Sequence, residues 1–132
     1  METLTIGQLA KRANVNLETI RFYERKGLLK EPPRNKSDHR QYSINDLRRT
    51  EFIRRSQSLG FSLQEISDLL SLRVESGKTC ADVKQKVKSK LTDIDAKIKE
   101  LQRIRNALLK IETSCPGKGP LDDCPILETL DS

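Results

Sequence analysis

The feature that most constrains this chain is the stretch from residue 80 to residue 114, which contains no proline and no glycine. Apolar residues recur in it at steps of three or four, the spacing of one stripe along a coiled-coil helix. At ~1.5 Å per residue, a helix from Cys80 to Thr113 is roughly 50 Å long. The stripe comprises Val83, Val87, Leu91, Ile94, Ile98, Leu101, Ile104, Leu108 and Ile111.

Such a helix needs a partner for its apolar stripe, because the residues between are mostly charged or polar. Apolar residues make up 35% of the chain and charged residues 33%, which suits long solvated helices better than one large core. The stripe could pack on the chain's own domain, but no other long helix is expected to cover it. The sequence therefore predicts a coiled-coil homodimer.

Two short helices are expected before this segment, over residues 4–13 and 17–27. Thr5 and Asn16 are good N-caps for them, and Gly27 is a good residue to end the second. Because only a few polar residues separate the two, the pattern predicts a helix-turn-helix.

Residues 28–42 are expected to form an exposed hairpin or wing. Pro32 and Pro33 exclude a helix there, and the residues that follow are polar and basic. Two more helices are then predicted, at residues 44–60 and 63–72, each beginning after a serine that opens a capping box, Ser43 and Ser62.

The positive charge of the chain lies in its first half. Residues 1–60 hold 13 Lys and Arg against 7 Asp and Glu, whereas residues 61–132 hold 12 against 12. A basic half favours a polyanionic partner such as nucleic acid, although charge asymmetry can also serve solubility alone.

The cysteines are three in number, which fits a set of disulfides poorly. No segment is long and apolar enough to span a membrane and no signal-peptide pattern opens the chain, so a cytoplasmic protein with reduced thiols is expected. Clustered reduced thiols usually bind metal or act in redox chemistry. An enzyme is not expected, because the chain has no C-x-x-C and no His or Lys placed near a cysteine as a base.

The segment NLETIRFYERKGLL, with GQLAKRANV before it and RQYSINDLRRTEFIRRSQSLGFSLQEI after it, resembles the DNA-binding domain of the MerR family of bacterial transcription regulators. The resemblance continues through the chain. It implies a mainly α fold: a winged helix-turn-helix with linking helices at residues 1–75, an antiparallel coiled-coil helix at 76–113, and a metal-binding loop with a short helix at 114–132.

Side chains that contact DNA are expected on the second helix and on the wing. A recognition helix reaches bases from its N-terminal residues, while Arg and Lys grip phosphates. Tyr23 could equally belong to the core, and His39 is expected to face solvent or phosphate. The predicted DNA-binding residues are Thr19, Arg21, Tyr23 and Arg25 on the helix and Arg40 and Tyr42 on the wing, of which Arg21, Tyr23, Arg40 and Tyr42 are also implied by the resemblance.

The three cysteines lie at opposite ends of the long helix, so one chain cannot bring them together. Cys80 is at its start, while Cys115 and Cys124 follow its end. In an antiparallel dimer, Cys80 of one subunit would meet Cys115 and Cys124 of the other, giving two sites. A Cys115–Cys124 disulfide, and cysteines used as small apolar residues, are the alternatives.

Three thiolates without a histidine form a soft metal site. Asp122 or Asp123 could add an oxygen ligand, so zinc, cadmium and lead stay possible. Copper sensors of the family have a shorter loop spacing and no cysteine at the position of Cys80. The loop most resembles that of the mercury-responsive members, which implies Hg(II) as the effector.

The expected function is that of a mercury-responsive regulator of mercury-resistance genes. The resemblance implies a homodimer on double-stranded promoter DNA that distorts the DNA when Hg(II) binds, so that RNA polymerase can open the promoter. A lead, cadmium or zinc sensor of the same family, or a thiol redox sensor, is the alternative.

Overall fold

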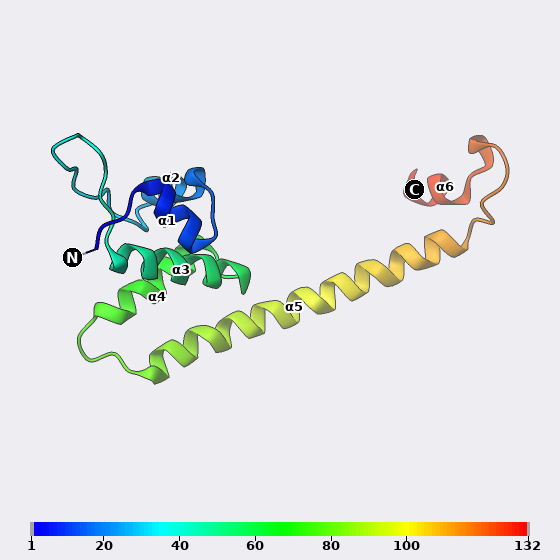
Figure 1. The fold of residues 1–132 in the computed structure, drawn as a ribbon. Helices are drawn as coiled ribbons and strands as arrows, with labels where there is room; N and C mark the ends of the chain where they lie inside the picture. Colours follow the sequence, from blue (N-terminus) through cyan, green and yellow to red (C-terminus); the bar gives the residue numbers. More distant parts are fainter. Residues whose placement is uncertain (1, 132) are drawn as a thin grey trace. The chain divides into compact units, whose positions relative to one another are not determined.

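The computed structural model describes residues 2–131, whose regular elements are helical (Figure 1). They divide into two compact units at the boundary between Val83 and Lys84. The predicted division of the chain into three functional parts, with limits at residues 75 and 113, stays a prediction. No helix in residues 2–131 is both long and apolar enough to cross a membrane. The elements are α1 (Ile6–Ala13), α2 (Leu17–Arg25), α3 (Ile44–Ser58), α4 (Leu63–Val74), α5 (Cys80–Thr113), the 3-10 helix η1 (Leu121–Asp123) and α6 (Pro125–Asp131).

Helices α1 and α2 form the predicted helix-turn-helix, and side chains fix both of their starts. The Thr5 hydroxyl accepts from the amide of Gln8 at 3.1 Å, and the Gln8 side chain accepts from the amide of Thr5 at 2.9 Å. Asn16 accepts from the amide of Thr19 at 2.8 Å. Asn14 adopts a left-handed backbone with φ 59° and ends α1, as short polar residues can do.

The first unit has one hydrophobic core. Helices α1 and α2 pack on each other, α1 packs on α3, and α3 packs on α4. The predicted capping boxes at Ser43 and Ser62 are present and begin α3 and α4. The core residues are Leu4, Leu9, Ala10, Ala13, Ile20, Tyr23, Leu28, Leu29, Tyr42, Leu47, Ile53, Ile66 and Leu70.

Residues 28–42 are not exposed throughout as expected, because Leu28, Leu29 and Tyr42 are buried in the core. The exposed part, residues 34–41, which we call the wing from here on, forms a loop between α2 and α3 (Figure 1). Instead of paired strands, the connection has isolated backbone bridges, between Arg34 and Arg40 and between Leu4 and Tyr42. The loop is closed by the amide of Asn35, which donates to the carbonyl of His39 at 2.8 Å. The side chain of Asn35 in turn accepts from the amide of His39 at 3.0 Å. Backbone hydrogen bonds and the side chain of Asn35 therefore hold the wing without a strand ladder.

Helix α5 is continuous over 34 residues, and none of them is buried. Most of its predicted apolar stripe is exposed, including Leu101 at 64% and Leu91 at 53% of their full surface. Exposure of this much apolar surface along one helix is unusual for a stable monomer. After α5, residues 114–120 lead through two left-handed glycines, Gly117 and Gly119, to η1 and α6.

Candidate DNA-binding surface and metal-binding thiols

Helix α2 presents a basic exposed face. The guanidinium of Arg25 lies 6.0 Å, and the ammonium of Lys26 5.7 Å, from the centre of the Phe22 ring. Arg21 is half exposed and forms an ion pair with Glu18 at 2.9 Å. Since exposed pairs of this kind contribute little to stability, the Arg21 guanidinium can exchange Glu18 for a phosphate or a base at small cost.

Thr19 lies in the first turn of α2 and is half buried. Its hydroxyl donates to the side chain of Asn16 at 2.9 Å, and its amide donates to the same oxygen at 2.8 Å. This threonine therefore supports the helix cap, and it stands at the end of α2 from which recognition helices reach bases.

Tyr23 and Tyr42 belong to the core, which for Tyr23 is the alternative that the sequence left open, and the predicted role of either in DNA binding stays a prediction. Each is 1% exposed. Tyr23 donates its hydroxyl to Gln57 of α3 at 2.6 Å, and Tyr42 donates to Glu24 at 3.3 Å. Burial raises the pKa of both hydroxyls, so both stay protonated as donors at neutral pH. The sequence FYER in α2 does not by itself show that the tyrosine faces the core.

Arg40 lies between two carboxylates. Its guanidinium contacts Glu24 at 3.0 Å and Glu31 at 3.2 Å, and its side chain is 29% exposed. The residue predicted to bind DNA is thus already engaged by acids. Sequence reasoning overlooked Glu24, and an acid within a basic segment was the one signal that could have found it.

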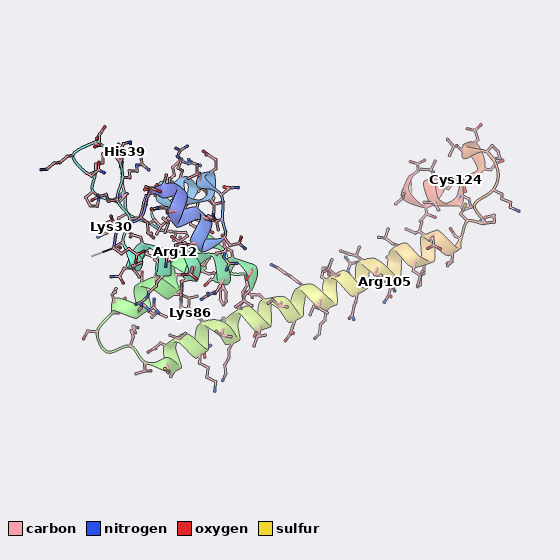
Figure 2. The ribbon with its side chains drawn as sticks, viewed as in Figure 1. Arg12, Lys30, His39, Lys86, Arg105 and Cys124 are labelled. Atoms are coloured by element: carbon pink, nitrogen blue, oxygen red, sulfur yellow. The ribbon has the colours of Figure 1, made fainter. Side chains whose placement is uncertain are left out.

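The wing adds exposed basic groups beside α2. Arg34 forms an ion pair with Glu31 at 3.5 Å and donates to the carbonyl of Asp38 at 3.0 Å. Lys36 and His39 are exposed on the loop, where Figure 2 labels His39. Two shallow recesses are each lined by residues of both α2 and the wing. One is lined by Arg21, Glu24, Arg25, Glu31 and Arg40, and the other by Thr5, Ile6, Arg21, Arg34, Asp38, His39 and Arg40.

Cys80 is the first residue of α5 and is exposed. The turn before it is fixed by Asp82, which accepts from the amide of Thr79 at 2.7 Å. That hydrogen bond lowers the pKa of the Asp82 carboxyl, and nearby Lys78 adds to the effect. The Thr79 hydroxyl accepts from the amide of Ala81 at 3.2 Å. Cys80 therefore stands at a well-ordered helix start with its thiol accessible.

Cys115 and Cys124 lie in the segment after α5, and both are half buried. The Cys115 sulfur accepts from the amide of Gly117 at 3.4 Å. Cys124 directly precedes α6, as Figure 2 shows. All three cysteines are free thiols. Thiolates are the preferred ligands of soft metal ions, so the donor set suits such an ion.

Within residues 2–131 of one chain, no three His, Cys, Asp or Glu side chains gather as a metal site. The structure thus places Cys80 at one end of α5 and the other two cysteines after its other end. The assignment of Cys80, Cys115 and Cys124 as metal ligands stays a prediction, which requires a second subunit.

Comparison with known families gives two matches that together cover most of the chain. Residues 4–73 match the model described as MerR HTH family regulatory protein. Residues 47–111 match the model described as MerR, DNA binding. The second match extends from α3 through nearly all of α5.

Individual relatives are similar over nearly the full length. A mercuric resistance operon regulatory protein of Bacillus cereus is 42% identical over 125 residues, covering 95% of each chain. The structure of the regulator PbrR691 from Ralstonia metallidurans in complex with lead(II) has a TM-score of 0.87 and 35% identity, covering 96% of this chain and 98% of that one. The structure of MerR from Bacillus megaterium in complex with mercury(II) has a TM-score of 0.75 and 37% identity, covering 98% and 100%.

Proposed function

Since the chain belongs to the MerR family of DNA-binding, metal-responsive transcription regulators, we propose that it is a homodimeric sensor of Hg(II) that controls mercury-resistance genes. The observation that carries the proposal is the placement of three free thiols, one at the start of α5 and two after its end. Its relatives include regulators of mercuric resistance operons.

The DNA end of the protein would work through α2 and the wing. We expect Thr19, Arg21 and Arg25 to meet the edges of bases and the phosphates of one DNA groove, since they lie on the exposed side or in the first turn of α2. Lys36 and His39 would meet the phosphates of the flanking DNA. This contact surface leaves out Tyr23 and Tyr42, which lie in the core.

The metal end would be shared between subunits. An antiparallel pair of α5 helices buries the exposed stripe and brings Cys80 of one subunit beside Cys115 and Cys124 of the other. Each dimer then has two sites of three sulfur ligands. Hg(II), as a soft ion, prefers thiolate over oxygen or nitrogen donors.

Metal binding would change the DNA through the dimer. An ion bound by both subunits fixes the start of one α5 against the end of the other, and so restrains the angle between the two DNA-binding units. Because bending or untwisting DNA costs only a few kcal/mol, a coupling energy of about 1–3 kcal/mol is sufficient to alter the bound promoter. RNA polymerase in the cytoplasm would then open the distorted promoter.

The first experiment is a metal titration of the reduced dimer in the presence of an excess of a small competing thiol. Hg(II), Pb(II), Cd(II) and Zn(II) are compared on the wild type and on Cys80→Ala. The control variant is Ser114→Ala, which lies beside Cys115 and removes a hydroxyl that donates to the carbonyl of Ile111. We expect Hg(II) to be retained by the wild type and the control and to be lost on removal of Cys80.

Retention of Pb(II) in place of Hg(II) would assign the protein to lead sensing, the alternative that the similarity to PbrR691 favours. Binding that is indifferent to Cys80 would refute the shared site. In parallel, a DNA duplex selected by the wild type from a random-sequence pool, placed between promoter elements, should give more transcript with Hg(II). Transcription unchanged by every metal would refute the regulatory role.

A further inference from the structure

The side chain of Glu24 on α2 points into the protein and toward the wing, although α2 is otherwise basic on its exposed face. It is 10% exposed, and its Oε1 atom accepts from Arg40 at 3.0 Å and from the Tyr42 hydroxyl at 3.3 Å. Its Oε2 atom is buried without a hydrogen-bond partner among residues 2–131. Burying a carboxylate is costly unless a cation compensates it, so Glu24 depends on Arg40.

Arg40 in turn belongs to the base of the wing. It forms a backbone bridge with Arg34 across the loop, and its guanidinium reaches both Glu24 and Glu31. Neither the Arg34–Arg40 bridge nor the closing hydrogen bond of Asn35 belongs to a strand ladder. The Arg40–Glu24 ion pair therefore joins the wing to α2, whereas Glu31 lies on the connection between them.

We propose that Glu24 and Arg40 are positioning residues that lock the wing against α2, and that DNA binding depends on this lock. The inference rests on the proposed binding of promoter DNA by α2 and the wing. The exposed Lys36 and His39 of the wing then keep the spacing from Arg21 that one DNA surface requires.

The lock makes a prediction whose sign is opposite to that of simple charge repulsion. Replacing Glu24 by Gln removes a negative charge beside a polyanion, so electrostatics alone predicts tighter binding. A broken lock predicts weaker binding, because the wing loses its fixed place. Glu18 is the matched control, since it is an exposed acid on the same helix that pairs with Arg21, and Glu18→Gln should bind DNA equally or more tightly.

The test measures affinity for the duplex selected by the wild type, as a function of salt, for the full chain and its variants. We expect Glu24→Gln and Arg40→Ala each to weaken binding about three- to tenfold, which corresponds to the loss of one charge-assisted link. The double variant should be no weaker than the weaker single one, because both act on one contact. Unchanged or tighter binding by Glu24→Gln, or losses that multiply in the double variant, would overturn the lock.

A second readout needs no DNA. Amide hydrogen exchange of the free protein should accelerate at Asn35 and Gln41 in Glu24→Gln, while amides of α5 keep their wild-type rates. If Glu24→Gln does not fold, Arg40→Gln carries the same test, because it removes the cation of the same pair from a side chain that is 29% exposed. A wild-type chain that selects no DNA would refute the proposed function, whereas equal exchange at the wing amides would refute the lock alone.

Discussion

At the scale of single residues, Arg21 is the exposed cation that we propose as the main contact of α2 with DNA. It lines both recesses beside the wing, and its partner in the free protein is the exposed carboxylate of Glu18. DNA phosphates can replace that carboxylate without uncovering a buried charge. Arg21 therefore combines accessibility with a contact that is easily exchanged.

We expect Arg21→Ala to weaken binding to the selected duplex by about 1–3 kcal/mol if the side chain reads a base. A phosphate contact alone would instead lower the magnitude of the salt slope by about one unit. Titrations at several salt concentrations measure both. Arg105→Ala is the control, since it removes an equal charge from the exposed surface of α5, and equal affinities of the two variants would exclude Arg21 from the interface.

The assignment of Tyr23 to the core gives a separate prediction. Tyr23→Phe removes the hydrogen bond to Gln57 and should lower the free energy of unfolding by about 0.5–1.5 kcal/mol. The affinity of the folded protein for DNA should stay the same. Chemical denaturation and DNA titration measure the two quantities, and a loss of affinity at unchanged stability would return Tyr23 to the DNA-binding surface.

At the scale of elements, sequence and structure agree where local chemistry decides. The caps at Thr5, Asn16, Ser43 and Ser62 are predictable because a short polar side chain before a helix has one effective hydrogen-bonding role. The long helix is predictable because nothing in it breaks a helix. Contacts between residues far apart in the sequence are harder to predict. The burial of Tyr23 and the pairing of Glu24 with Arg40 depend on how α2 packs against the wing and α3.

The stripe on α5 gives the prediction at this scale. Ile98→Asp places a charge near the middle of the stripe, where Ile98 is 48% exposed in the single chain. If a second α5 covers this face, the variant should become monomeric or dissociate at much higher concentration, because a buried unpaired charge is costly. Ala96→Asp introduces the same group on the opposite side of the helix and should stay dimeric. Analytical ultracentrifugation distinguishes them, and two variants of equal mass in solution would contradict the coiled-coil dimer.

At the scale of the whole molecule, the proposed metal sites belong to the dimer and not to the chain. This property can be tested by mixing subunits. A Cys80→Ala chain supplies only the two loop cysteines, and a chain with Cys115→Ala and Cys124→Ala supplies only Cys80. Neither homodimer has a complete site, whereas the mixed dimer has one.

We therefore expect the mixture, after subunit exchange, to bind Hg(II) under thiol competition. Each mixed dimer should bind one ion, half the number that a wild-type dimer binds. Each variant alone should lose the ion under the same competition. Mass spectrometry of the intact mixed dimer counts bound metal directly. Failure of mixing to restore binding would show that the cysteines do not cooperate across subunits.

The exposed stripe of α5 also has a consequence for how the cell maintains this protein. A newly made chain without a partner exposes that apolar surface to solvent. Proteases and chaperones recognise unfolded or unassembled proteins by such surfaces. Pairing hides it. We expect the concentration of dimer to rise more steeply than the rate of synthesis when expression is low. Unpaired chains would then be degraded and would not bind promoters as monomers.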